Sequence, residues 1–267
     1  MQLSDCRVVL TGATGGIGLA LVEQLCAGGA HVLAVTRQPA ALAALRASYP
    51  HTLREIVADL RTPAGRHAIV EAARHMGGIN LLLNGAGVNR FALIEQLDDH
   101  AIADMLTVNV IATLQLTRAM LPTLRSQPHA LVVNVGSTYG SIGYPGYAVY
   151  CASKFALRGF SEALRRELAD TDVNVLYVAP RATRTSMNSA VAMALNQALK
   201  ASVDEPQRVA QAVMGAIQKN LCELYLGWPE KLFVRLNGLL PSVVDHALRK
   251  QLPVIRSFIH SQENPPR

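Results

Sequence analysis

Three residues in the middle of the chain have the types and spacing needed for proton transfer: Ser137, Tyr150 and Lys154. Residues four apart share one face of a helix, so the ammonium group of Lys154 can lie beside the phenol of Tyr150. A phenol ordinarily has a pKa of about 10, and a neighbouring cation favours its ionised form and lowers that pKa. Tyr150 is therefore a candidate general acid or base, and the hydroxyl of Ser137 can hold the oxygen that receives the proton.

A glycine-rich segment near the N-terminus is the second chemical feature. The apolar run Arg7–Leu10 precedes it, and a helical apolar pattern follows it. Glycines let the backbone approach a diphosphate, and a helix N-terminus offers amide donors, although an ordinary strand-to-helix turn has a similar composition. No Gly-Lys-Ser/Thr follows, which excludes a nucleotide-triphosphate loop. We expect dinucleotide contacts from Gly12, Thr14, Gly16, Ile17 and Gly18.

Five motifs occur together along the chain: Thr11–Gly18, Asn84–Gly87, Asn109, Ser137 and Tyr150–Lys154. In their order and spacing, the chain resembles the short-chain dehydrogenase/reductase family over roughly residues 5–226. The resemblance implies a Rossmann-like α/β fold, a nicotinamide dinucleotide cofactor and hydride transfer to or from a carbonyl carbon. It also implies that Asn109 holds a water on a proton relay to Lys154.

By the same resemblance, Tyr150 exchanges the proton, Ser137 binds the substrate oxygen, and Lys154 also binds the nicotinamide ribose. Each residue has a structural alternative, since Asn109 can satisfy buried backbone groups and Ser137 can close a turn. Three nearby tyrosines lack a lysine four residues later. We expect them to line the substrate entrance; they are Tyr139, Tyr144 and Tyr147.

The residues at the end of the second predicted strand bear on the choice of cofactor. An acidic residue there binds a ribose 2′-hydroxyl, whereas an arginine accommodates a 2′-phosphate. This chain has Thr36 and Arg37, which favours NADP(H), although Arg37 could instead be a solvated side chain. Asp59 and Leu60 match the family position that contacts the adenine ring, and Asp59 could also cap the next helix.

Two further turns match cofactor-binding positions of the family. Asn84, Ala86 and Gly87 follow the fourth predicted strand, where the family shapes the adenine side of the site and braces the central strands. After the sixth strand, the resemblance implies cofactor contacts from Pro180, Thr183 and Thr185. Arg181 stands where the family has glycine. It could restrict the backbone near the nicotinamide, contact an acidic substrate, or point to solvent.

Length and composition predict one α/β domain. The 267 residues are half apolar, which suffices for one large core. The net charge of +6 comes from scattered arginines without an aromatic platform, so we do not expect nucleic-acid binding. The chain shows no signal peptide and no apolar run long enough to span a membrane. Its four scattered cysteines lack metal-ligand spacing, so we expect no metal, reduced thiols and a cytoplasmic location.

Strand and helix patterns alternate, which predicts a doubly wound parallel seven-stranded sheet in a three-layer α/β/α arrangement. The predicted strands are Arg7–Leu10, His31–Val35, Leu53–Val57, Asn80–Asn84, Ala130–Val135, Asn174–Val178 and Glu223–Leu226. The predicted helices are Ile17–Ala27, Ala40–Ala47, Ala64–Met76, Asp99–Leu121, Tyr147–Leu168 and Pro206–Gln218.

Two segments interrupt the alternation: a substrate loop at 185–202, rich in Ala and Met, and a C-terminal extension at 227–267. Apolar side chains recur at helical spacing on either side of Pro241 and are accompanied by basic residues. We expect these helices and the loop to cover an apolar pocket. Packing on the core or across a dimer is the alternative, and contact with an anionic membrane is a further possibility.

The sequence thus predicts a homodimeric NADPH-dependent reductase of a ketone or aldehyde, with the long helices around Asp99–Leu121 and Tyr147–Leu168 at the family's usual interface. Two alternatives keep the same fold. One is an NAD-dependent alcohol dehydrogenase that uses the same site in the opposite direction. The other is a non-catalytic dinucleotide-binding regulatory or scaffold protein, a class that commonly loses part of the tyrosine–lysine pair.

Overall fold

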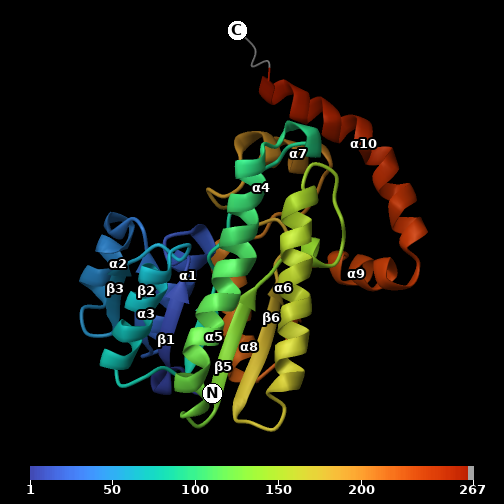
Figure 1. The fold of residues 1–267 in the computed structure, drawn as a ribbon. Helices are drawn as coiled ribbons and strands as arrows, with labels where there is room; N and C mark the ends of the chain where they lie inside the picture. The colour runs from blue at the N-terminus through green and yellow to red at the C-terminus, as the bar shows by residue number, and fades with distance from the viewer. Residues whose placement is uncertain (264–267) are drawn as a thin grey trace.

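A computed structural model describes residues 1–263, so the last four residues of the predicted C-terminal extension lie outside the description. The chain forms one α/β domain whose seven parallel strands follow the order β3-β2-β1-β4-β5-β6-β7, and helices cover both faces (Figure 1). This confirms the predicted doubly wound sheet. The strands are β1 (Arg7–Thr11), β2 (His31–Thr36), β3 (Leu53–Val57), β4 (Leu81–Asn84), β5 (Ala130–Val135), β6 (Val173–Ala179) and β7 (Glu223–Tyr225).

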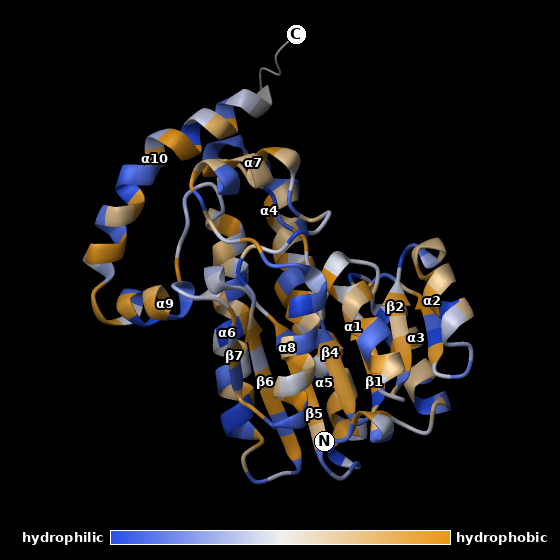
Figure 2. Ribbon diagram, turned by 180° about the vertical axis from the view of Figure 1, so that it is seen from behind, coloured by the Kyte–Doolittle hydropathy of each residue, from blue (hydrophilic) through white to orange (hydrophobic). Residues whose placement is uncertain are grey.

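Both faces of the sheet are buried, as expected when helices alternate with parallel strands. In β1, Val8 and Leu10 belong to the apolar core on one face, and Val9 belongs to the core on the other; all three are fully buried. One face packs against α1 (Gly16–Ala27) and α8 (Pro206–Gln218), which lie in front of the sheet in Figure 2. The other face packs against α3 (Pro63–His75), α5 (Ala112–Arg125) and α6 (Ala148–Glu167).

The predicted helix Asp99–Leu121 is not continuous. It consists of α4 (Asp99–Leu106), a π-helical turn at Thr107–Ile111, and α5. Such wider turns often occur at functional sites, and this one contains Asn109, whose buried side chain bonds the backbone of another segment. The predicted helix Ala40–Ala47 likewise begins as a 3-10 turn and continues as α2 (Ala43–Ser48).

The segment predicted as a loop at 185–202 contains a helix that the sequence analysis missed, α7 (Ala190–Ala198). Its N-cap is Ser189, whose side chain accepts a hydrogen bond from the amide of Ala192. Alanine is the strongest helix former, so the Ala-rich composition of this segment favours the helix that the sequence analysis did not predict.

The C-terminal extension forms two helices on either side of the predicted break, α9 (Glu230–Leu239) and α10 (Pro241–Glu263), which confirms the predicted pattern. Proline suits the first turn of a helix because its missing amide would have no partner there, so Pro241 ends one helix and begins the next. Figure 1 shows the pair leaving the body after β7 and returning across α7. Within residues 1–263, no helix combines the length and apolarity needed to cross a bilayer.

Candidate active site

The predicted site residues gather along the carboxyl ends of the strands. Two hollows adjoin there and share Gly12 and Gly87. One hollow contains Ser137, Tyr150 and Lys154 together with the turn after β6, and the other contains the ends of β2 and β3. Every predicted cofactor or catalytic residue lines this double cleft except Asn84 and Asn109.

The glycine-rich turn after β1 packs tightly against the turn after β4. Gly12 has a φ of +72°, and a Cβ there would come within 2.6 Å of the backbone of Gly85. The hydroxyl of Thr11 accepts hydrogen bonds from the amides of Gly85 and Ala86, at 3.1 and 3.2 Å. These contacts fix the two turns to each other and leave their outer surfaces facing the cleft.

Helix α1 starts at this turn without a side-chain cap, so its first amides retain donors for an anionic group. Close packing continues along the helix, because a Cβ on Gly18 would lie 2.0 Å from the carbonyl oxygen of Gly12. On the other side, Gly16 lies against Thr185, whose side chain would be 2.6 Å from an added Cβ. The turn therefore presents backbone, rather than side chains, toward a bound group.

Tyr150 and Lys154 lie on the same face of α6, as the four-residue spacing predicts. The ammonium nitrogen of Lys154 lies 5.6 Å from the centre of the Tyr150 ring and donates to the carbonyl of Val135 at 3.0 Å. Tyr150 shares a side-chain hydrogen bond with Ser137. Ser137 also accepts from the amide of Tyr139 at 3.1 Å, so it closes a turn as well as facing the phenol.

Burial, rather than charge, dominates the proton affinities of this pair. Removal from water raises the pKa of Tyr150 to about 12, against the opposing effect of its hydrogen bond with Ser137. Removal from water also lowers the pKa of Lys154 to about 8. The expectation that Lys154 depresses the pKa of Tyr150 is therefore wrong for this structure. Tyr150 is protonated at neutral pH, which is the form that donates a proton.

Asn109 lies behind the cleft and braces it. Its side-chain oxygen accepts from the amide of Val88 at 2.8 Å, and its amide donates to the carbonyl of Val88 at 2.9 Å. The same amide donates to the hydroxyl of Ser153 at 3.0 Å, and Ser153 donates to the carbonyl of Tyr150 at 2.7 Å. The structural alternative predicted for Asn109 is thus present, and the chain of bonds connects it to α6.

Asn84 does not face the cleft, contrary to its prediction as a cofactor ligand. Its amide donates to Thr117 at 3.0 Å and to Asn134 at 2.9 Å, and Asn134 donates to Ser161 at 2.9 Å. All four side chains are buried between the sheet and its helices. The side chain of Asn84 therefore braces β4, β5 and the helices rather than the cofactor site.

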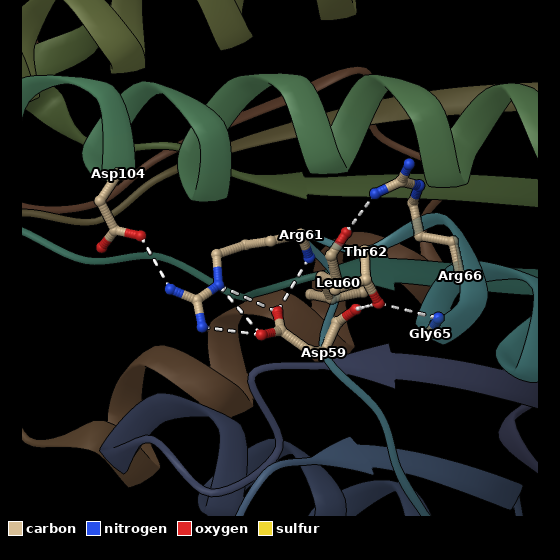
Figure 3. A network of polar contacts seen from close by, with 7 residues as sticks. All are labelled: Asp59, Leu60, Arg61, Thr62, Gly65, Arg66 and Asp104. Carbon is tan, nitrogen blue, oxygen red and sulfur yellow. Dashed lines mark hydrogen bonds and ion pairs between the residues drawn. The ribbon is translucent and has the colours of Figure 1, made fainter. Parts of the chain in front are cut away.

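A carboxylate–arginine network borders the second hollow (Figure 3). Asp59 accepts from the backbone amide and the guanidinium of Arg61, and Arg61 also bonds Asp104 of α4 at 3.0 Å. The hydrogen bonds from Arg61 lower the pKa of Asp59 to about 2, so this carboxylate is ionised at neutral pH. Thr62 caps α3, which corrects the alternative that Asp59 is the cap.

Tyr177 is a positioning residue that the sequence analysis missed. Its hydroxyl donates to the carbonyl of Ser137 at 3.1 Å, and an added Cβ on Gly136 would lie only 2.3 Å from its ring. A tyrosine within a buried strand has no sequence signal that distinguishes it from other core residues. Ser153 could have been found, because it lies within the tyrosine–lysine motif.

The three additional tyrosines form a wall beside Tyr150. Tyr139 stacks on Tyr144 with ring centres 5.0 Å apart, and Tyr147 lies 6.0 Å from Tyr150. Tyr139 and Tyr147 line the hollow that contains Tyr150, as predicted for the substrate entrance, whereas Tyr144 lies behind them. Burial raises the pKa of all three phenols above their usual value.

An apolar cluster surrounds the tyrosine wall and includes both segments expected to cover the pocket. Ala192 and Leu195 come from α7, while Ile255 and Ile259 come from α10 and are almost fully buried. The hydroxyl of Tyr144 contacts Gln251 of α10 at 3.3 Å. The C-terminal helix therefore forms part of the environment of Tyr150 rather than an independent tail.

Arg181, the residue that departs from the family pattern, borders the hollow that contains Tyr150, but its guanidinium is bonded to two carboxylates. Its guanidinium donates to both carboxylate oxygens of Asp204, at 2.9 and 3.0 Å, and to Glu230 at 3.1 Å. Its side chain is only 12% exposed. The solvent interpretation is therefore wrong, and two carboxylates already neutralise the guanidinium.

Known proteins share this arrangement over most of the chain. Residues 7–196 match the family model described as short chain dehydrogenase. The 3-oxoacyl-[acyl-carrier-protein] reductase FabG of Haemophilus influenzae is 31% identical over 67% of this chain and 74% of its own length. The ketoacyl reductase HetN of a Nostoc species is 29% identical over 92% of this chain and 89% of its own.

A solved short chain dehydrogenase from Burkholderia cenocepacia, in complex with NADP, has the same fold. It superimposes with a TM-score of 0.80 at 26% identity, over 93% of this chain and 99% of its own. The family match extends from β1 into α7 and includes the glycine turn, Ser137, Tyr150 and Lys154. The chain therefore belongs to the short-chain dehydrogenase family and is an oxidoreductase.

Proposed function

We propose that the protein reduces an apolar ketone or aldehyde with NADPH. The observation that carries this proposal is the buried, protonated Tyr150, hydrogen-bonded to Ser137 and adjacent to Lys154 at one end of a glycine-lined cleft. A protonated phenol can donate its proton to a carbonyl oxygen, as reduction requires.

The residues around the glycine turn fit a dinucleotide. Gly12, Gly16 and Gly18 each lie where an added Cβ would collide, so backbone alone borders this part of the cleft. Uncapped amides at the start of α1 suit a diphosphate, and Thr185 lies beside that start. We assign the nicotinamide end to the hollow with Tyr150 and the adenine end to the hollow with Asp59.

The proposed mechanism gives each polar group one task. Tyr150 donates its proton to the substrate oxygen, and the hydroxyl of Ser137 donates a hydrogen bond to the same oxygen as negative charge develops there. Lys154, when protonated, stabilises the phenolate that remains after the proton has left. Asn109 fixes the backbone beside Lys154 through Val88 and Ser153. A bound nicotinamide supplies the hydride to the carbonyl carbon.

Arg37 supports the choice of NADP(H) over NAD(H). It is exposed at the end of β2 in the adenine hollow, and the neighbouring Thr36 carries no charge that would repel a 2′-phosphate. Its positive charge already acts at this end of the cleft, because it contributes to the low pKa of Asp59. A guanidinium can bind a phosphate through two parallel hydrogen bonds.

The same reasoning extends to assembly and location. Ile111 and Phe155 are large apolar residues that remain 46% and 42% exposed, beside and on the paired helices α5 and α6 (Figure 1). We propose that this helical face pairs with a second copy across a two-fold axis. The four free cysteines suit a reducing compartment, so we place the protein in the cytoplasm.

The pH dependence of carbonyl reduction tests the catalytic assignment. Because the pKa of Lys154 is about 8, its ammonium is lost as pH rises through that value, and kcat should fall with it. In Lys154→Arg, kcat should fall only at a higher pH, since a guanidinium stays protonated.

Tyr150→Phe should lower kcat roughly 10²–10⁴-fold at every pH. Initial rates of NADPH consumption measure the pH profile and the kcat of each variant. Tyr144→Phe is the control and should retain the wild-type kcat. A fully active Tyr150→Phe enzyme would refute the mechanism.

The cofactor assignment predicts a selective effect of one substitution. Arg37→Ala removes a charge-assisted hydrogen bond worth about 1.5–3 kcal/mol, so the Kd for NADPH should rise roughly 10- to 100-fold. The Kd for NADH should change little, because NADH lacks the 2′-phosphate. Fluorescence titration of both cofactors measures this, and Arg74→Ala on the distant helix α3 is the matched control. Equal weakening of both cofactors would contradict the assignment.

The proposed dimer predicts twice the mass of one chain in sedimentation equilibrium. Phe155→Glu places a charge on the proposed interface and should shift the equilibrium toward monomer. Leu221→Glu, at a comparably exposed leucine in the turn between α8 and β7, should leave the dimer intact. A wild-type protein with the mass of one chain at micromolar concentration would overturn this assembly.

A further inference from the structure

Arg181 joins two segments that are far apart in the sequence. Asp204, its bidentate partner, is almost fully buried and ends the segment that contains α7. The third guanidinium nitrogen reaches Glu230, the first residue of α9, and also donates to the carbonyl of Trp228 at 3.2 Å. One side chain therefore connects the substrate segment, residues 185–202, to the start of the C-terminal arm, which we define as residues 227–263.

Asp204 is also the position at which the chain closes the substrate segment. Its amide donates to the carbonyl of Ala182, and its carbonyl accepts from the amide of Arg184, both at 2.9 Å. These bonds form a short parallel bridge that holds the two ends of the substrate segment together. Fixing Asp204 through its carboxylate therefore fixes the base of the whole segment.

The arm approaches Arg181 closely and in a defined conformation. Gly227 has a φ of +95°, and an added Cβ would lie 2.7 Å from Arg181 and 2.6 Å from Glu230. Only glycine combines this backbone conformation with this proximity. The chain thus passes directly over the ion pair before α9 begins.

The two segments meet again at their far ends. Ile255 and Ile259 of α10 belong to the same buried cluster as Ala192 and Leu195 of α7, and Tyr150 is part of that cluster. Figure 1 shows α10 crossing α7 at this end of the molecule. The substrate segment and the arm are therefore attached to each other at an ionic contact and at an apolar contact, with the substrate side of Tyr150 between them.

We propose that Arg181 is a positioning residue that holds the substrate segment and the C-terminal arm as one cover, and that this cover determines how well long apolar carbonyl substrates bind. Arg181 acts through these segments, because its guanidinium is already bonded to Asp204 and Glu230. A small substrate reaches the polar groups beside Tyr150, whereas a long chain also reaches the substrate segment, whose Met187 and Asn196 line the hollow. The arm supports that segment from behind, because α10 packs against α7. The proposal rests on the proposed carbonyl reduction for its kinetic consequences only.

Glu230→Gln is the appropriate test because it weakens the connection to the arm and leaves the buried Arg181–Asp204 pair intact. Removing Arg181 itself would take both close hydrogen bonds from the buried carboxylate of Asp204 and leave it only the longer contact with Arg208 at 3.9 Å, which can unfold the protein. Glu205→Gln is the matched control, since Glu205 pairs with Arg184 at 2.8 Å but both side chains are more than half exposed. Exposed pairs of this kind contribute little.

For a series of methyl ketones, Glu230→Gln should raise KM for the longest members up to roughly tenfold, because it removes the charge from one partner of a partly buried hydrogen bond. Its kcat, and the KM of the shortest ketone, should stay within about twofold. Arg181→Lys should resemble Glu230→Gln, because an ammonium cannot bond both carboxylates in the same geometry. A uniform change for short and long ketones would refute the role in selecting substrates.

Amide hydrogen exchange tests the same cover without turnover. Glu230→Gln should accelerate exchange in α9 and also in α7, whereas Glu205→Gln should accelerate neither. If exchange rises in α9 alone, the two segments are independent and the proposal fails. If α7 and α9 respond together but no carbonyl is reduced by the wild-type protein, the cover stands and the proposed function fails.

A second observation concerns the outer surface of the arm. Six large apolar side chains within residues 228–243 remain exposed, between 42% and 80% of each side chain's surface. The turn between α9 and α10 projects from the body in both views (Figures 1 and 2). We call this surface the elbow; its apolar residues are Trp228, Leu232, Phe233, Leu239, Leu240 and Val243.

The charges on the elbow indicate what covers it. Lys231 and Arg235 are exposed on α9, the helix that also carries Leu232, Phe233 and Leu239. A two-fold pairing of elbows would bring like charges toward one another, whereas an anionic lipid surface would attract them and accept the apolar side chains. Trp228 suits the interfacial region, where its indole can remain partly hydrated. We propose that the elbow docks on anionic membrane surfaces.

Co-sedimentation of the full chain with vesicles tests this proposal. At low salt, the protein should bind vesicles of phosphatidylglycerol and phosphatidylcholine in equal parts, and should bind phosphatidylcholine alone at least several-fold less. Leu239→Asp should lower the bound fraction about tenfold, while Leu221→Asp, another exposed leucine, should not. Wild-type protein that stays in the supernatant would overturn the proposal. So would a Leu239→Asp variant that binds normally, or one that instead changes the oligomeric mass without lipid.

Discussion

Seven parallel strands end at one edge of the sheet, and this constraint places every part of the active site. The turns after β1 and β4 meet there, with Gly12 pressed against Gly85 and the hydroxyl of Thr11 bonded to two amides of the second turn. Ser137 follows β5, and Thr185 follows β6. Each turn contributes a few atoms, and the common direction of the strands brings those atoms together.

Burial then determines the chemical state of the residues that this edge gathers. Tyr150 and Lys154 are adjacent in space, yet the loss of hydration raises the pKa of the phenol and lowers that of the ammonium. Both shifts favour the neutral pair at alkaline pH, because a low-polarity environment penalises either charge. The apolar cluster that includes α7 and α10 contributes to this environment, so the substrate cover and the proton chemistry depend on the same packing.

The arginine at position 181 shows how one departure from a family pattern can acquire a structural role. Glycine in its place would leave the buried Asp204 with only the longer contact to Arg208, and the carboxylate of Glu230 would lose its bond to Arg181. Arg181, Asp204 and Glu230 therefore form one charged unit at the start of the C-terminal arm. A side chain that sequence comparison marks as unusual is here the connection between two segments that contact the site.

Local pattern in the sequence determined the elements and the family. Strand and helix periodicity predicted all seven strands and a parallel sheet, and the four-residue spacing predicted that Tyr150 and Lys154 share a helical face. The sequence alone did not determine what each polar side chain bonds, because those partners are distant along the chain. Asn84 bonds Asn134 in the core, Asp59 accepts hydrogen bonds from Arg61, and the hydroxyl of Tyr177 donates to the carbonyl of Ser137. Only the tertiary structure decided these contacts and the burial that reverses the expected pKa shift of Tyr150, since desolvation depends on what surrounds a group rather than on its neighbours in sequence.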